Sequence, residues 1–270
     1  MFLTTRALVL REVKYKDADK LLTVLTEGEG KLTVKARGAL RKGCKYGAAA
    51  QMLCYSEMTL FQNAGKWSMN EAETIEQFLP LRDHIALLAL GTYFAELLEA
   101  VSDEDDPNPA LLRLGLNSLY ALSRALYPPE RVKAVFEWKL MCLSGFQPQL
   151  DACPACGTLD PEDPMLALHG GTLHCRKCPP GAVGRSVPLS QDALAALRYI
   201  VRADLKKVFS FRVPPAADKL LGDVAEQYVQ AQLERGFGAL EYWKQVGAAP
   251  LSRPSDWPPR AAAPTYIQDR

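Results

Sequence analysis

The chain has 270 residues, seven cysteines and a formal net charge of +1 at pH 7. This length predicts about two or three domains, and the near-zero net charge excludes a uniformly basic, nucleic-acid-coating protein. The sequence has no secretory leader pattern at its start and no apolar run long enough to span a bilayer. We therefore expect a cytoplasmic protein with no membrane partner.

Short β-rich runs separated by turn residues fill the first 78 residues. The expected strands are Thr5–Glu12, Lys20–Thr26, Gly30–Arg37, Gln51–Phe61 and Lys66–Ile75. Five strands with a long connection between the third and the fourth fit a small, partly open barrel such as the OB-fold. An SH3-like barrel has similar strand statistics, and the pattern alone does not separate the two. We expect residues 1–78 to form a β-barrel domain.

After the barrel, the hydrophobic pattern changes to helical spacing. Asn108 before Pro109, and Ser190 further on, are N-cap start signals. We expect the helices of residues 79–150 and 188–246 to form one bundle around an insert at 151–187. Residues 247–270, rich in Pro and Ala, are expected to form a disordered tail. The expected helices are Leu81–Ser102, Asn108–Leu126, Glu130–Ser144, Ser190–Arg202 and Ala216–Gly236.

Two C-x-x-C pairs, Cys153 with Cys156 and Cys175 with Cys178, are separated by eighteen residues. This spacing is typical of four-cysteine zinc sites, because each pair places two thiolates on one tight turn. Four thiolates close the coordination sphere, so we expect one structural zinc ion in a zinc ribbon and not a catalytic metal. A redox dithiol is the weaker alternative because no βαβ pattern surrounds either pair. Iron is an alternative metal, since it also binds four thiolates.

The remaining cysteines and the nearby histidines are assigned no chemistry. We expect His169 and His174 to lie in turns or on the surface, although either is able to replace a cysteine ligand. Cys44, Cys54 and Cys142 are expected to be buried or half-buried apolar residues. The sequence contains no P-loop, no dinucleotide-binding fingerprint and no nucleophile elbow. We therefore expect a binding protein and not an enzyme.

Basic residues are concentrated after the third expected strand, and no acidic residue occurs from Gly30 to Ser56. On a barrel, such a segment predicts a phosphate-binding rim; the alternative is an ordinary solvated face. Tyr15, Tyr46, Tyr55, Phe61 and Trp67 are the aromatic residues suited to base stacking, and some of them must be core. Tyr46, inside the basic loop, is the preferred stacking candidate. The expected DNA-binding residues are Lys31, Lys35, Arg37, Arg41, Lys42, Lys45 and Tyr46.

The N-terminal run ALVLREVKYKDADKLLTVLTEGEGKLTVKARGALRKGCKYGAAAQ, with a helical region and a CPAC…HCRKC insert behind it, resembles the RecO family of bacterial DNA repair proteins. The most specific part begins at Asp17 and Asp19, passes through Thr26 and Gly30, and continues into KARGALR. The resemblance extends to about Val246, and the proline-rich segment beyond it departs from the family.

The resemblance implies an α+β multidomain protein: an N-terminal OB-fold barrel, a central and C-terminal α-helical bundle, and a four-cysteine zinc ribbon. It implies a recombination mediator that binds single- and double-stranded DNA, anneals complementary strands and, with RecR, promotes RecA loading at the nucleoid. A further implied partner is the C-terminal tail of single-stranded DNA-binding protein (SSB). Arg131, Lys133 and Lys139, beside apolar helix faces, are candidate receptors for that acidic tail. We expect a monomer when the protein is alone.

Two functions of other classes stay open. A zinc-ribbon transcription or processing factor would read a specific DNA sequence through a helix or ribbon placed in a groove. A zinc-dependent hydrolase or deaminase would keep an exchangeable water on the metal.

Overall fold

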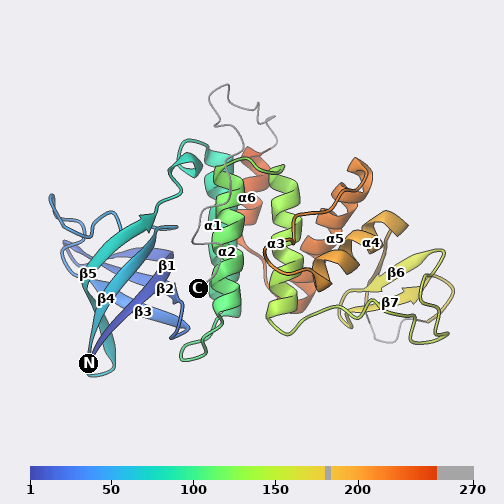
Figure 1. The fold of residues 1–270 in the computed structure, drawn as a ribbon, viewed down its shortest axis with the longest axis horizontal. Helices are drawn as coiled ribbons and strands as arrows, with labels where there is room; N and C mark the ends of the chain where they lie inside the picture. The colour runs from blue at the N-terminus through green and yellow to red at the C-terminus, as the bar shows by residue number, and fades with distance from the viewer. Residues whose placement is uncertain (180–183, 248–270) are drawn as a thin grey trace. The chain divides into compact units, whose positions relative to one another are not determined.

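The computed structural model describes residues 1–179 and 184–247 (Figure 1). The described chain divides into two compact units. The first contains Met1–Arg124 together with the segment that begins at Phe237, and the second contains Ala125–Gly236. Within the described residues, no helix has both the length and the hydrophobicity needed to cross a membrane. The expected tail, from residue 248 onward, lies outside the described residues.

The first unit begins with a closed five-stranded barrel in which the strands follow the order β1-β2-β3-β5-β4. β1 pairs antiparallel with β2 and with β4, whereas β3 and β5 close the barrel as a parallel pair. The five expected strands are therefore confirmed, and the topology is that of the OB-type barrel. The strands are β1 (Phe2–Tyr15), β2 (Asp19–Thr26), β3 (Lys31–Ala36), β4 (Tyr55–Asn63) and β5 (Lys66–Glu76).

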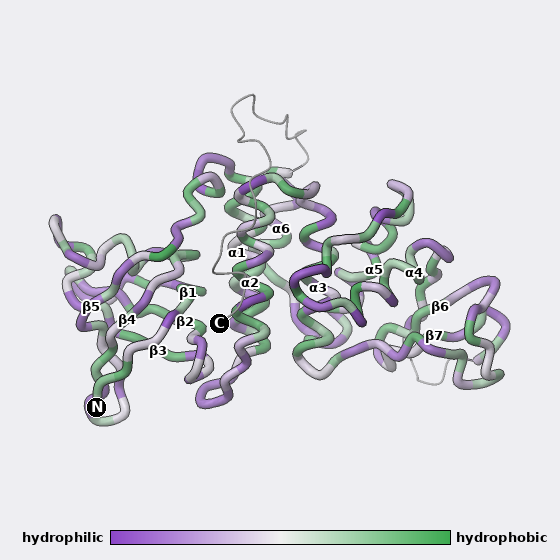
Figure 2. Tube along the Cα trace, viewed as in Figure 1, coloured by the Kyte–Doolittle hydropathy of each residue, from purple (hydrophilic) through white to green (hydrophobic). Residues whose placement is uncertain are grey.

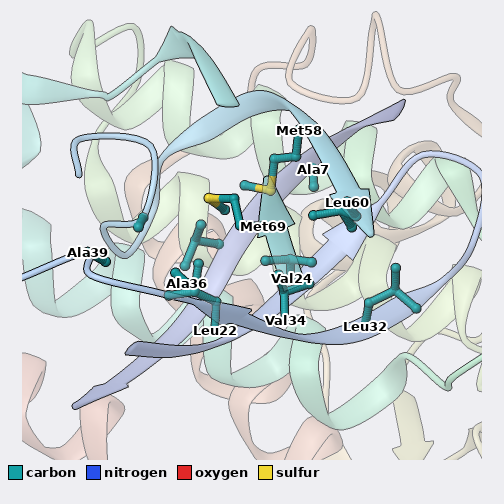
Figure 3. Packing of buried hydrophobic residues seen from close by; sticks show 12 residues of the cluster. Ala7, Leu22, Val24, Leu32, Val34, Ala36, Ala39, Met58, Leu60 and Met69 are labelled. Atoms are coloured by element: carbon teal, nitrogen blue, oxygen red, sulfur yellow. The ribbon is translucent and has the colours of Figure 1, made fainter. Parts of the chain in front are cut away.

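The barrel core is formed by every second side chain of the strands, because successive side chains point alternately into and out of the barrel. On β3, Leu32, Val34 and Ala36 are buried, and the residues between them point outward. Met58 and Met69 fill the space beside the shorter side chains. The same alternation shows as changes between hydrophobic and hydrophilic colour along the barrel strands (Figure 2). The core cluster drawn in Figure 3 consists of Ala7, Val9, Leu22, Val24, Leu32, Val34, Ala36, Ala39, Ala50, Met58, Leu60 and Met69.

Three helices complete the first unit: α1 (Ile85–Val101), α2 (Pro109–Ser123) and α6 (Gly238–Val246). A 3-10 turn, η1 (Leu79–Leu81), precedes α1. The predicted start of α2 is confirmed, because the Asn108 side chain accepts a hydrogen bond from the Leu111 N–H at 3.3 Å. Gly115 lets α2 approach its neighbours, since a Cβ there would lie 2.7 Å from Leu98 Cδ1.

The second unit consists of α3 (Pro129–Leu143), α4 (Gln191–Arg202), α5 (Pro215–Leu233) and a small sheet. The sheet has the order β7-β6-β8, with β6 (Pro164–Ala167), β7 (Thr172–Cys175) and β8 (Ser186–Pro188). Trp138 joins α3 to α5: its indole N–H donates to the Leu221 carbonyl at 3.2 Å, and its ring lies 5.0 Å from that of Tyr228. The expected N-cap at Ser190 is also confirmed, by a hydrogen bond from the Ala193 N–H.

The helices fall into two groups, one in each unit, and the expected packing of later helices on an earlier one is seen for α4 and α5 on α3. In the unit that contains the barrel, α6 packs against α1. The reason lies in α1, which is buried around most of its circumference and so needs cover on more than one side. The sequence predicted no element at residues 238–246, where the structure places α6.

Candidate nucleic-acid interface and metal centre

A groove with a cavity volume of about 790 Å³ lies on the outside of the barrel. Three of the residues that line it are cations, three are aromatic, and none of these described residues is acidic. A lining of this composition suits a flexible polyanion whose bases present flat π-faces. The lining residues are Tyr15, Leu21, Thr33, Lys35, Arg37, Phe61, Asn63, Ala64, Gly65, Lys66, Trp67 and Ser68.

The β3 wall of the groove follows from strand alternation. Because the apolar residues of β3 point into the core, Thr33, Lys35 and then Arg37 must point outward. β2 supplies Leu21 directly opposite Lys35 in the antiparallel register. The alternation along β3 and its register with β2 therefore place cationic and apolar side chains together on the outer face of the barrel.

Lys35 is held in place by an ion pair. Its Nζ lies 3.0 Å from Asp19 Oδ2 and 5.0 Å from the centre of the Tyr15 ring. The Gly38 N–H donates to Asp19 Oδ1 at 2.8 Å. This backbone hydrogen bond, and then Lys35, lower the pKa of the Asp19 carboxyl below its ordinary value. Asp19 thus stays ionised and partly neutralises Lys35.

The turn between β4 and β5 forms the opposite wall. Ala64 and Gly65 both have positive φ, of 47° and 73°, and they reverse the chain so that Lys66 projects into solvent. Trp67 is half-buried against the barrel core, whereas Phe61 is 37% exposed. The sequence left the places of Phe61 and Trp67 undecided and did not single out Lys66. The turn signal Asn63-Ala64-Gly65 was the clue to its position, because it placed Lys66 at a loop edge.

The structure distributes the predicted DNA-binding residues unequally. Lys35 and Arg37 line the groove. Arg41, Lys42 and Lys45 are exposed in the turns that follow β3. They extend the positive charge beyond the groove wall without lining it.

Two of the predicted residues lie elsewhere. Lys31 donates its Nζ hydrogen to the Glu99 carbonyl of α1 at 2.8 Å, away from the groove. Tyr46 is half-buried against the barrel core, and its hydroxyl donates to the Arg37 carbonyl. Burial raises the pKa of the Tyr46 hydroxyl. Its ring therefore packs partly against the barrel core, and its hydroxyl is tied to the loop backbone.

The four predicted metal ligands converge in the second unit. The Sγ atoms of Cys153, Cys156, Cys175 and Cys178 all lie within 4.8 Å of one another. The first pair occupies a turn closed by the Gly157 N–H, which donates to the Cys153 carbonyl at 2.8 Å. The second pair begins at the last residue of β7 and closes with the Cys178 N–H donating to the Cys175 carbonyl at 3.1 Å. Each C-x-x-C is thus a tight turn, as the spacing predicted.

The electrostatics of this cluster fit a divalent cation. Burial opposes ionisation of Cys153, but backbone N–H donors from Cys175, Cys156 and then Ala155 outweigh it and lower its pKa to about 6. The Thr158 hydroxyl in turn lowers the pKa of Cys156. Cys156 then raises the pKa of Cys175, and raises that of Cys178 to about 12. Four thiolates this close need a cation among them to ionise together.

The histidines near the cluster are not part of it. His174 is only 3% exposed, so the expectation of a surface position is wrong. Its Nδ1 lies 2.9 Å from the Cys175 carbonyl oxygen, and its Nε2 lies 2.9 Å from Ser186 Oγ. These contacts tie β7 to the start of β8, a role that the sequence pattern did not predict. The expectation for the other cysteines is confirmed: Cys54 is buried, and Cys44 and Cys142 are half-buried.

The three basic residues suggested as receptors for an acidic peptide are all engaged within the chain. Arg131 pairs with Asp218 at 2.8 Å. Lys133, 5% exposed at its side chain, pairs with Glu137 at 2.9 Å and with Glu226 at 3.2 Å. Lys139 donates to three backbone carbonyls at the end of α4. These contacts argue against them as receptors.

A five-stranded OB-type barrel, a cationic and aromatic groove on its surface and a four-cysteine cluster define the class: an OB-barrel protein with a cysteine-cluster module. The family model "Recombination protein O N terminal" matches residues 1–78, and "Recombination protein O C terminal" matches residues 82–241. The chain belongs to the Recombination protein O family, which confirms the resemblance drawn from the sequence.

Similarity to individual relatives extends over most of the chain. It is 32% identical to the DNA repair protein RecO of Acetivibrio thermocellus, over 91% of this chain and 97% of that protein. It is 29% identical to the DNA repair protein RecO of Alkaliphilus metalliredigens, over 91% of this chain and 100% of that protein. It is also 29% identical to the DNA repair protein RecO of Symbiobacterium thermophilum, over 90% of this chain and 96% of that protein.

Proposed function

We propose that this protein acts in DNA repair and homologous recombination by binding DNA through the barrel groove, without catalysing a reaction. The observation that carries this proposal is the lining of the groove, which combines Lys35, Arg37 and Lys66 with three aromatic side chains and no carboxylate. Phosphates would contact the cations, and unpaired bases would stack on Phe61 and Trp67. Contacts of these kinds do not depend on base sequence.

Annealing of complementary strands follows from such a surface. A strand held mainly by its phosphates keeps its base edges free for pairing with a second strand. The exposed cations of the loop after β3, Arg41, Lys42 and Lys45, would add phosphate contacts for that second strand or for a duplex. We propose binding of both single- and double-stranded DNA on this basis.

Family membership supports the proposed partners. These are RecR, with which the protein would promote RecA loading, and the C-terminal tail of SSB. We propose a monomer when the protein is alone, and a nucleoid-associated, cytoplasmic location. The competing proposal, a factor that reads a specific sequence, predicts that random single-stranded DNA competes poorly for binding.

We propose that one zinc ion, held by Cys153, Cys156, Cys175 and Cys178, folds the insert at residues 151–187. The cluster geometry and the all-thiolate donor set support zinc in a structural role. When bound, the ion would supply charge compensation and a cross-link between the two turns. The sheet of β6, β7 and β8 has strands of only three or four residues, too little to form a core of its own. The barrel, residues 1–78, would remain the DNA-binding domain.

Annealing of complementary oligonucleotides coated with cognate SSB tests the proposal. We expect the protein to accelerate annealing, and we expect the double variant R37A/K66A to lose most of this acceleration. Lys31→Ala is the matched control, because Lys31 lies outside the groove. Failure of the unmodified protein to accelerate annealing of either coated or naked strands would reject the proposed function.

A further inference from the structure

The register of the barrel strands places one more aromatic residue in line with the groove. Lys35 on β3 pairs with Ser68 on β5, Ser68 pairs with Phe61 on β4, and Phe61 pairs with Phe2 on β1. β1 begins beside the β4–β5 turn in Figure 1. These four residues therefore form one row across neighbouring strands, with Lys35 at one end and Phe2 at the other. Phe2 is not among the residues that line the groove.

Phe2 offers an open aromatic surface at that point. The residue is 65% exposed, and its ring lies 5.0 Å from the ring of Phe61 with an angle of 48° between their planes. Phe61 belongs both to this pair and to the groove lining. The stacking surface of the groove thus continues over β4 onto β1.

The next two rows of paired residues on this face of the barrel are polar or charged and not aromatic. Beyond Phe2 and Phe61 comes a row of Thr4 and Thr59, which pairs with Glu71. In the row after that, Arg6 lies beside Glu57, and Glu57 lies directly opposite Glu73. Carboxylates at these positions repel a phosphate backbone. A strand that leaves the groove over Phe61 is therefore confined to the row that contains Phe2.

We propose that Phe2 is an additional nucleic-acid-binding residue, which extends the groove so that a single strand seated between Lys35 and Phe61 stacks one further base on Phe2. This inference rests on the proposed function of the groove. The occupant is single-stranded nucleic acid and not a protein segment, because the aromatic row is continuous with a wall of cations and bounded by carboxylates. The contact is independent of sequence, since every base has a π-face.

Binding of oligothymidylates of increasing length to the full chain tests the proposal. For strands just long enough to fill the groove, Phe2→Ala should bind as the unmodified protein does. For longer strands, Phe2→Ala should lose about fivefold or more in affinity, the lower end of what removal of one stacking aromatic costs. The slope of log affinity against log salt should not change, because stacking releases no counterions. Phe2→Trp, which keeps an aromatic ring at this position, should bind the longer strands as tightly as the unmodified protein does.

Ile75→Ala is the matched control, because Ile75 is 38% exposed on the same barrel but lies near the other end of β5. It should bind every length normally. An equal loss for Phe2→Ala at all lengths, or no loss at any length, overturns the inference. If the unmodified protein binds no strand of any length, the proposed function of the groove fails as well. If it binds and Arg37→Ala flattens the salt dependence while Phe2→Ala changes nothing, only the extension onto Phe2 fails.

Discussion

Replacement of Lys139 by methionine should destabilise the end of α4. The Lys139 side chain is nearly buried, and its Nζ donates to the carbonyls of Ile200, Val201 and Ala203 at 3.2, 3.0 and 2.7 Å. These carbonyls end a helix, where backbone acceptors lack partners and a cation is favourable. Hydrogen bonds from a charged donor contribute about 1.5–3 kcal/mol each, so the three give roughly 4.5–9 kcal/mol before the cost of burying the ammonium. That cost is several kcal/mol, which leaves a net loss of about 2–4 kcal/mol for Lys139→Met.

Hydrogen exchange followed by mass spectrometry on peptides from α4 measures this loss directly. A loss of about 2 kcal/mol lowers the protection of the last turn of α4 roughly 30-fold. Lys207→Met, an exposed substitution in the segment after α4, is the control and should leave protection unchanged. Equal protection of α4 in Lys139→Met and Lys207→Met would refute the reasoning.

Three further predictions concern the metal cluster and the groove. If the proposed zinc ion is bound, Cys175→Ser, or chelation, should remove one equivalent of it together with the exchange protection of the small sheet, while the barrel keeps its affinity for single-stranded DNA. Asp19→Asn should strengthen DNA binding and steepen its salt dependence, because Lys35 is then free of its competing carboxylate. Tyr46→Phe should leave DNA affinity unchanged, since the Tyr46 hydroxyl contacts only the Arg37 carbonyl in the described chain.

A specific result would contradict each of these three predictions. A Cys175→Ser protein with a stable second unit but without DNA binding would make the cysteine insert a DNA-binding surface. Weaker binding by Asp19→Asn would show that Asp19 orients Lys35 for DNA and does not compete with it. A large loss for Tyr46→Phe would show that the hydrogen bond from its hydroxyl to the Arg37 carbonyl holds the basic loop in its DNA-binding conformation.

Asp19 also predicts a dependence of stability on pH. The pKa of its carboxyl is lowered, first by the Gly38 N–H and then by Lys35, so the folded state favours the ionised form. The resulting stabilisation is fully present above the ordinary pKa, 3.8, and is lost as the pH falls through the lowered value. Asp19→Asn should therefore reduce the acid sensitivity of the barrel below about pH 4, as followed by circular dichroism. An unchanged acid transition would contradict the assignment.

Local patterns predicted the five barrel strands and the helices α1 to α5, because each pattern reports which face of a strand or helix is buried. The alternation around Val34 and Lys35 determined both the core of β3 and the wall of the groove. The C-x-x-C pairs predicted the cysteine cluster, since the spacing of thiols on a tight turn is a local property. The N-caps at Asn108 and Ser190 were predicted for the same reason.

Contacts between distant segments were not predictable in this way. Tyr46 looked accessible in a basic loop, but that loop folds back so that Ala39, Tyr46 and Ala50 pack on the barrel core. Lys139 looked like a surface cation, yet its partners are 61 or more residues away in the sequence. α6 was missed for a related reason: a nine-residue segment carries little helical periodicity, and its packing partner α1 lies far away in the sequence.

The salt dependence of single-stranded DNA binding tests the central claim most directly. If the barrel groove holds phosphates, Arg37→Ala should flatten the slope of log affinity against log salt by about 0.7 for each phosphate that the protein no longer neutralises. Lys31→Ala, which removes a cation outside the groove, should leave the slope as it is in the unmodified protein. An unchanged slope for Arg37→Ala, or a flatter slope for Lys31→Ala than for Arg37→Ala, would contradict the account and place the DNA elsewhere.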